Sequence, residues 1–311
     1  MRLAGVANRK TYIAGKRHAR SVMTHIVRTL FLLGVGFVTL YPVLYMISAS
    51  FMSVSDTLNP TTVWVPSSLN WFNFRMAFKL MNYSATLMNT VKLVVPCVAL
   101  QVVSCLFIAY GFARFRFKGR GILFILLIFN IIVPAKCYMI PIYVLMSDLE
   151  LLNTYLQFYL QAALGVGIRS ALYIFILRQV FMNMPKELEE AAYIDGCSPL
   201  QTFLRVMVPN VISSALTVTV FSLVWYYNDY TMSGMLLNKN YPLAVAITNA
   251  STALDSQAQY LTGQAMIADI KIMRASILAA ACLITVIPLI VIYILVQKHF
   301  TEGVERTGIV G

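Results

Sequence analysis

Several long stretches of the chain carry no charged residue, among them Thr29–Ser55 near the start and Ala275–Gln297 near the end. About 20 consecutive apolar residues, wound as an α-helix, cross the hydrocarbon core of a membrane. Charged residues make up 12% of the 311-residue chain and hydrophobic ones 59%, whereas soluble domains carry about 25% charged residues. The first stretch also exceeds the apolar part of a cleaved secretory signal, which has about 7–15 residues. The sequence therefore predicts an all-α integral membrane protein whose first span is retained.

Six transmembrane helices are predicted, and two of them carry an irregularity. The third is interrupted by Pro134, and broken helices are tolerated at membrane depth where protein or a cavity covers the freed backbone groups. The fourth contains Arg169, which would cost about 2.5–3.5 kcal/mol in lipid and should therefore face protein or water. The predicted spans are residues 29–51, 87–110, 121–138, 154–182, 210–227 and 275–297, with outer loops at 52–85, 139–153 and 231–274.

The charges of the loops predict the orientation. Residues 1–28 carry seven basic residues and residues 111–120 carry four, with no acid in either segment. The loops 52–85 and 139–153 together hold two basic residues and three acids. Cytoplasmic loops are enriched in Lys and Arg, so both termini are predicted to be cytoplasmic. The domains expected are a basic cytoplasmic segment (1–28), a six-helix membrane domain (29–300) and a cytoplasmic tail (301–311).

The formal net charge of +12 raises the question of a nucleic-acid partner. Between Arg114 and Arg120, basic residues alternate with phenylalanines, a pattern that also occurs at RNA contacts. Here the segment directly follows a predicted span, where basic and aromatic side chains hold the interface and anionic lipid. We therefore expect membrane lipid as the partner of this segment and no nucleic acid.

Candidates for catalysis or metal binding are not found in the sequence. No Gly-x-x-x-x-Gly-Lys-Ser/Thr phosphate loop occurs, so the chain itself is not expected to hydrolyse ATP. The three histidines lie near the termini, and the five cysteines show no metal-ligand or Cys-x-x-Cys spacing. No catalytic residue, metal or cofactor is therefore predicted.

The segment Pro185–Pro209 lies between two predicted spans and is expected to form two short helices joined by a tight turn. Pro185 suits the first position of the first helix. Gly196 is expected to end that helix, because glycine enters the left-handed conformation without a Cβ clash. Ser198 and Gln201 have the spacing of a capping box, which predicts the start of the second helix.

The spacing within this segment resembles the EAA loop of ABC importer permeases. Glu190, Ala191 and Ala192 are followed after three residues by Gly196, and nine residues later by Val-Met-Val and Pro209. The family pattern ends in Ile-x-Leu-Pro, so two valines depart from it conservatively. We call residues 185–209 the EAA unit. The resemblance implies a type I ABC importer permease fold with six transmembrane helices, and an EAA unit that docks on a separate ATPase. The coupling residues would be Glu190, Ala191, Ala192, Gly196 and Pro209.

The resemblance is closest to maltose-type carbohydrate importer permeases of the bacterial cell membrane. It implies as partners a second homologous permease, two ATPase subunits, an extracellular solute-binding lipoprotein and a sugar or oligosaccharide. A permease of the same fold for another solute, such as a polyamine or a phosphorus compound, is the alternative. A secondary transporter or a membrane enzyme should instead show internal hydropathy symmetry, ionisable residues at the membrane centre or a catalytic cluster, and these are not seen.

A translocation path is predicted near the outer end of the fifth span. The family often has Trp-Asn-Asp here, whereas this chain has a tyrosine before the Asn-Asp pair. Aromatic rings can stack on sugars, but aromatic residues also form belts at membrane interfaces, and in some relatives only the partner permease holds the sugar. The residues predicted to line the path are Arg169, Tyr226, Tyr227, Asn228 and Asp229.

Overall fold

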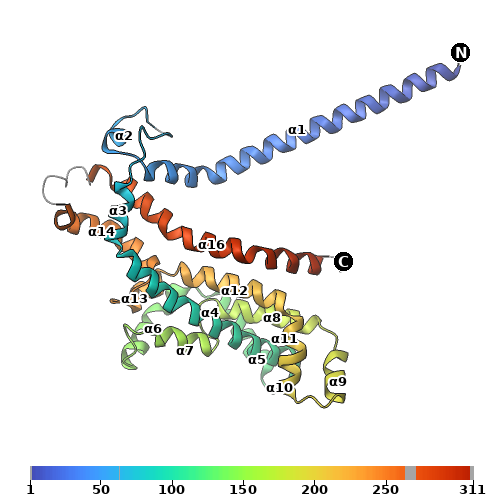
Figure 1. Cartoon of the computed structure of the whole chain (residues 1–311). Coiled ribbons are helices and arrows are strands. Elements are labelled where there is room, and N and C mark those ends of the chain that lie inside the picture. Colours follow the sequence, from blue (N-terminus) through green and yellow to red (C-terminus); the bar gives the residue numbers. More distant parts are fainter. Residues whose placement is uncertain (1, 63, 263–270, 309–311) are drawn as a thin grey trace.

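The computed structural model describes residues 2–62, 64–262 and 271–308, and this part of the chain is helical without any strand (Figure 1). The prediction of an all-α protein is confirmed. The helices are α1 (Arg2–Ser50), α2 (Val54–Leu58), α3 (Phe72–Leu80), α4 (Tyr83–Arg114), α5 (Arg120–Ile132), α6 (Ala135–Asp148), α7 (Leu156–Ala163), α8 (Ser170–Asn183), α9 (Glu187–Ile194), α10 (Pro199–Thr202), the π-helix η1 (Phe203–Met207), α11 (Val208–Asn210), α12 (Ile212–Tyr227), α13 (Thr231–Leu236), α14 (Leu243–Thr262) and α16 (Arg274–Gly308).

Three helical stretches among the described residues are long and apolar enough to cross a membrane: Val22–Ser50, Tyr83–Arg114 and Arg274–Leu295. Two bent pairs bring the number to five if each pair is one span, namely α5 with α6 and the helices of residues 199–210 with α12. The fourth predicted span, 154–182, is divided between the short helices α7 and α8. The count of six spans therefore stays a prediction.

Pro134 breaks the third span as predicted. Val133, directly before it, is extended, with φ −67° and ψ 121°, because a proline ring disfavours the helical conformation of the preceding residue. The chain turns by 105° and continues as α6 to Asp148. The segment 139–153, expected as an outer loop, is thus largely helical. The outer segment 231–274 likewise contains α13 and α14.

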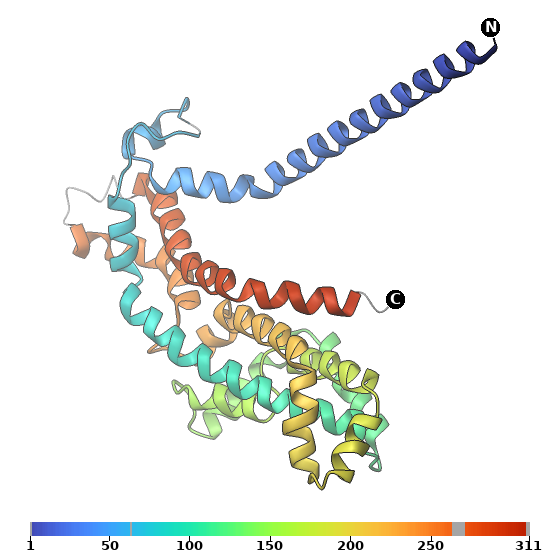
Figure 2. The same cartoon turned by 45° about the vertical axis from the view of Figure 1, so that its right-hand side comes forward.

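Helix α4 is the centre of the body. It packs against α3, α7, α8, α12 and α14, and Leu93, Cys97, Cys105 and Ala109 on it are fully buried. Helix α1 is different, because the most apolar part of Val22–Ser50 has no buried residue. α1 meets α16 and projects away from the body in both views (Figures 1 and 2). Its apolar surface is thus left for lipid or for a partner chain.

The ends of the described chain lie on one side of the molecule. Figures 1 and 2 both draw the beginning of α1 and the end of α16 away from α2, and α9 and α10 also lie at the end of the body remote from α2. This arrangement agrees with the loop charges, which predict both termini and the EAA unit on the same side of the membrane. That this side is the cytoplasm stays a prediction.

The segment between α1 and α3 is held by one buried carboxylate. Asp56 accepts hydrogen bonds from the Ser67 hydroxyl at 2.6 Å and from the Ser53 backbone N–H at 3.0 Å. These hydrogen bonds, that of Ser67 first, lower the pKa of Asp56 from 3.8 to about 2. The two ends of the loop are thus tied to each other through an ionised side chain.

Candidate functional site

The first helix of the EAA unit, α9, begins two residues later than expected. Lys186 precedes the first helical residue, Glu187, so the prediction that Pro185 occupies the first helical position is wrong by two residues. Met184 before the proline is extended, and the chain needs Pro185 and Lys186 to turn into α9. Glu187, Glu189 and Glu190 all fall in the first turn of α9, where the helix dipole favours negative charge.

Gly196 ends α9 as predicted. Its φ is +83°, and the Cys197 N–H donates to the Ala192 carbonyl at 2.9 Å while the Gly196 N–H donates to the Tyr193 carbonyl at 3.1 Å. This pair of bonds is the Schellman arrangement, which satisfies the last carbonyls of a helix. A Cβ atom on Gly196 would meet no atom within 4 Å. Backbone conformation, and not crowding, therefore requires glycine here.

The second half of the EAA unit is capped and then distorted. Ser198 and Gln201 form the predicted capping box, with both reciprocal bonds present. The following turn, η1, is a π-helix in which the Val208 N–H donates to the Phe203 carbonyl. Pro209 has no N–H for the regular bond four residues back, and the chain bends by 78° before α12. Pro209 thus lies at the corner where the EAA unit meets the membrane helix.

The two faces of the EAA unit differ in what they contact. Ala192, Phe203 and Met207 are buried, and the latter two belong to the core that α4 and α8 form. Glu190 and Ala191 are exposed. Ile194, with 86% of its surface exposed, is one of several large apolar side chains that point outward, and the others are Leu188, Tyr193, Leu200 and Leu204. Apolar patches of this kind mark protein-interaction sites.

Glu189 ties the EAA unit to α4, and the sequence did not single out this role. Its carboxylate accepts a hydrogen bond from the Tyr110 hydroxyl at 2.7 Å and pairs with Nε of Arg114 at 3.2 Å. Arg114 also donates to the Met184 carbonyl at 2.8 Å. The side chains of the ion pair are only 8% and 12% exposed. The available signal was Arg114, four residues beyond the predicted span 87–110 and at the same membrane interface as an acidic helix.

A second polar region surrounds the turn between α7 and α8. The Gln101 amide on α4 donates to the Ile168 carbonyl at 2.6 Å and to the Ser170 hydroxyl at 3.0 Å. Its oxygen accepts from the Ser222 hydroxyl of α12 at 3.3 Å, and the Ser104 hydroxyl donates to the Ala162 carbonyl at 2.7 Å. Two carbonyls freed by the break are thus satisfied by side chains of α4, and Ser222 of α12 in turn holds Gln101, as the membrane interior requires.

The residues predicted to line a path are divided between surface and core. Arg169 is exposed at the start of α8, with φ +60°, and its guanidinium lies 4.3 Å from the ring centre of Trp225. Asn228 is exposed. Tyr226 and Tyr227 are buried, and the Tyr227 hydroxyl donates to the Thr285 carbonyl of α16 at 2.6 Å. Whether any of them lines a path stays a prediction.

The carboxylate of Asp229 is engaged in hydrogen bonds within the fold, which leaves less of it free to contact a substrate in a path. Its carboxylate accepts from the backbone N–H groups of Met232 and Ser233, at 3.1 and 2.9 Å, and from the Ser233 hydroxyl at 2.9 Å. It thereby satisfies the free N–H groups at the start of α13. Burial raises the pKa of Asp229, and these hydrogen bonds oppose the rise.

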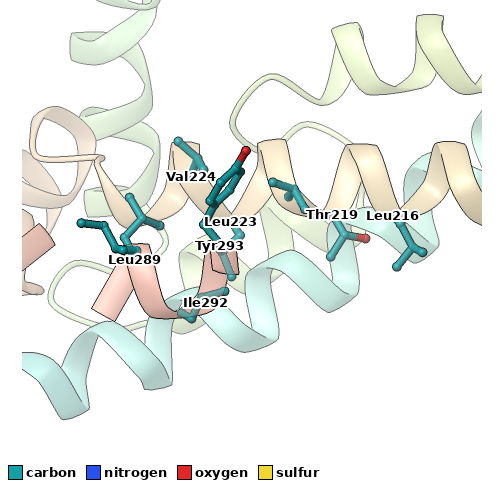
Figure 3. Close-up of a pocket in the computed structure, with 9 residues that line it drawn as sticks. Leu216, Thr219, Leu223, Val224, Leu289, Ile292 and Tyr293 are labelled. Carbon is teal, nitrogen blue, oxygen red and sulfur yellow. The ribbon is translucent and has the colours of Figure 1, made fainter. Parts of the chain in front are cut away.

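An apolar pocket of about 330 Å³ lies between α12 and α16 (Figure 3). Thr219, one of its two hydroxyl-bearing residues, donates back to the Ala215 carbonyl of its own helix at 2.8 Å. The pocket suits hydrocarbon better than a sugar, whose hydroxyls need polar partners. The residues that line the pocket are Leu216, Thr219, Val220, Leu223, Val224, Leu289, Ile290, Ile292 and Tyr293.

Among the described residues, no group of three or more His, Cys, Asp or Glu could hold a metal ion.

Comparison with known proteins places the chain in a transport family. Residues 12–306 match the family described as binding-protein-dependent transport system inner membrane component. The arabinooligosaccharides transport system permease protein AraQ of Halalkalibacterium halodurans is 26% identical over 89% of this chain and 93% of its own length. The polygalacturonan/rhamnogalacturonan transport system permease protein YtcP of Bacillus subtilis is 26% identical over 88% of this chain and 93% of its own length.

A solved structure agrees in fold. A chain from the crystal structure of a bacterial ABC transporter involved in the import of the acidic polysaccharide alginate matches with a TM-score of 0.71 at 23% identity, over 89% of this chain and 96% of that one. The family match covers nearly all of the chain and includes the EAA unit. This chain therefore belongs to the family of binding-protein-dependent transport system inner membrane components.

Proposed function

We propose that this chain is the permease subunit of an ABC importer that carries a sugar or oligosaccharide across the bacterial cell membrane. The named relatives AraQ and YtcP, both permeases of saccharide transport systems, favour a sugar over a polyamine or a phosphorus compound. The chain would cross the membrane six times with both termini in the cytoplasm. It would pair with a second, homologous permease and receive its substrate from an extracellular solute-binding protein.

The observation that carries this proposal is the two-faced EAA unit. Glu190 and Ile194 are exposed, and they offer a charge and an apolar surface to a separate ATPase subunit. Glu189 points the other way, into its ion pair with Arg114. A subunit that binds the exposed face would therefore displace α4 when it moves, because Glu189 on the opposite face is paired with Arg114 of α4. Two ATPase subunits would supply the ATP hydrolysis, and this chain needs no cofactor and no catalytic residue.

The packing of α4 suggests how such motion reaches the membrane centre. α4 contacts α7, α8 and α12, and Gln101 joins it to the α7–α8 turn and to α12. Closure of the ATPase dimer would displace the EAA unit and these helices together, as in rigid-body transitions of other proteins. The two orientations of the pore would then differ in energy because the ATPase contacts the EAA unit differently in each.

The test is sugar uptake by the complete transporter in liposomes with ATP inside and binding protein outside. Glu190→Ala should lower uptake and binding-protein-stimulated ATP hydrolysis together, by roughly tenfold or more, because a hydrogen bond to a charged group contributes about 1.5–3 kcal/mol. Glu187→Ala, a change of another exposed glutamate in the same helical turn, is the matched control and should have little effect. Equal activity of both variants and of the unchanged protein would contradict the proposed docking site.

A further inference from the structure

In the proposed topology, in which α8 is part of a span, Arg169 lies deep in the membrane. The α8 helix begins directly after it and ends at Asn183, four residues before α9 of the EAA unit. At 1.5 Å per residue this places Arg169 about 20 Å from the EAA end of α8, well inside a hydrocarbon core about 30 Å thick. Trp225 lies near the far end of α12, at a similar distance from the EAA unit. A charge at this depth marks a functional site by default.

The guanidinium of Arg169 has no carboxylate partner among the described residues. It lies 4.3 Å from the centre of the Trp225 ring, and its charge also acts on the buried Tyr173 hydroxyl. Both side chains are exposed, Trp225 by 43%. An arginine in the membrane interior normally pairs with a carboxylate or with backbone carbonyls. The donors of Arg169 are therefore available to a ligand or a lipid.

The position of Arg169 is fixed by its neighbours. It adopts the left-handed conformation, with φ +60°, which persists in non-glycine residues when the surroundings hold it. Gln101 holds the preceding carbonyl, that of Ile168. A Cβ on Gly167 would overlap the buried Tyr226 hydroxyl, so glycine is needed where the turn passes α12. The backbone of the α7–α8 turn is thus held by α4 and α12, and this fixes the position of the Arg169 Cα atom.

The guanidinium of Arg169 and the indole of Trp225 bind different chemical groups of a ligand. A guanidinium offers a planar fork of N–H donors that fits a carboxylate with two parallel hydrogen bonds. An indole ring offers an apolar face to the C–H groups of a pyranose. A sugar acid, or uronate, presents both of these surfaces within one ring.

We propose that Arg169 and Trp225 form a site for a carboxylate-bearing sugar on the transport path. This proposal rests on the proposed function and narrows its substrate class to uronate-containing oligosaccharides. The carboxylate binds the guanidinium, and the pyranose lies against the part of the indole that the guanidinium leaves exposed. A lipid phosphate offers the same anionic chemistry to Arg169, so the experiment must separate the two sources.

The same helix provides a matched control. Arg178 also stacks on an aromatic ring, with its guanidinium 3.9 Å from the ring centre of Phe124. It lies about 8 Å from the EAA end of α8, where an arginine side chain can reach the interface, and its Nε donates to the Phe112 carbonyl at 3.4 Å. Arg178→Gln removes the same charge and the same kind of ring contact without touching the proposed site.

The experiment measures uptake by the complete transporter in liposomes, with binding protein saturated by each sugar. The probes are disaccharides of galacturonate, glucuronate and mannuronate, each compared with its neutral methyl ester. We expect uptake of at least one uronate to exceed that of its ester by tenfold or more. Arg169→Gln should bring this ratio close to one, Arg169→Lys should lower it in part, and Arg178→Gln should leave it unchanged. Trp225→Ala should lower uptake of the acid and the ester alike.

The outcomes separate the proposals. Transport of neutral sugars with no preference for any acid would overturn the uronate site and leave the proposed function standing. Failure to transport any sugar, acid or neutral, would instead count against the proposed function. A ratio that Arg169→Gln leaves unchanged would also overturn the site. If the effect of Arg169→Gln vanished when zwitterionic lipids replaced anionic ones, the ligand of Arg169 would be a headgroup and the proposal would be wrong.

Discussion

The EAA unit and the turn between α7 and α8 both interrupt membrane helices, but different interactions hold them in place. In the EAA unit the shape comes from short-range bonds, such as the capping box of Ser198 and Gln201 and the bond between Cys197 and Ala192. The α7–α8 turn is held by Gln101, which is 67 residues away from Ile168 in the sequence. The EAA unit is shaped by bonds within itself and joins the core through Glu189, Phe203 and Met207, whereas the α7–α8 turn takes its shape from a side chain of α4. We infer that the EAA unit keeps its shape when it is displaced and that the α7–α8 turn moves with it through α4.

The largest effect is expected from breaking the attachment of the EAA unit. Glu189→Ala leaves the nearly buried Arg114 without its counter-charge, and loss of one partner of a buried pair costs about 3 kcal/mol or more. Thermal unfolding in detergent should show this loss, together with uncoupling of ATP hydrolysis from uptake. Glu189→Gln, which can still accept from Tyr110, should lose less. Wild-type coupling and stability in Glu189→Ala would mean that the ion pair transmits nothing.

The next effect concerns the α7–α8 turn. Gln101→Leu leaves the Ile168 carbonyl and the Ser170 and Ser222 hydroxyls without a partner, which should cost about 2 kcal/mol because unpaired buried polar groups are unfavourable. The measurement is the unfolding midpoint of the purified protein. Gln161→Leu on α7, a partly buried glutamine, is the control and should change the midpoint little. An equal shift in both variants would show that Gln101 has no special role.

A smaller effect is expected at Gly196, and it separates strain from contact. Gly196→Val places a β-branched residue at φ +83°, which costs roughly 1–3 kcal/mol. Because a Cβ meets nothing within 4 Å, Gly196→Asn, which tolerates this conformation, should retain most of the function. Binding of the ATPase subunit to the purified permease is the readout. Identical loss in the Val and Asn variants would indicate a steric contact instead of backbone strain.

Features that depend on nearby residues could be predicted from the sequence, whereas contacts between distant segments could not. The Gly196 turn, the capping box, the break at Pro134 and the family itself are confirmed, because each depends on residues a few positions apart. The ties of Glu189 to Arg114 and of Gln101 to Ile168 join distant segments and were not predicted. The burial of Tyr226 and Tyr227 was also missed, since an interfacial belt, a sugar site and a core position all favour aromatic residues.

The smallest effect concerns the loop between α1 and α3 and depends on pH. Hydrogen bonds lower the pKa of Asp56 to about 2 from 3.8, so the folded loop favours the ionised carboxylate. Its stabilisation is complete above about pH 4 and is lost as the pH falls toward 2. Asp56→Asn should therefore be less resistant to proteolysis at residues 53–70 at pH 6, and the difference from the unchanged protein should shrink toward pH 2. A difference that stays constant with pH would contradict this role of the carboxylate.

Docking of the EAA unit on a separate ATPase is tested most directly by cross-linking. In a background with the three cysteines that are not buried (Cys137, Cys197 and Cys282) replaced by serine, one cysteine is placed either at Ile194 on the EAA unit or at Val65 between α2 and α3. Both original side chains are highly exposed, by 86% and 79%, so accessibility is matched. Reconstituted with the ATPase subunit of its own transporter and a short bifunctional reagent, the Ile194→Cys chain should form a cross-linked product with the ATPase and the Val65→Cys chain should not. Cross-linking at residue 65 without cross-linking at residue 194 would contradict both the docking site and the orientation of the chain.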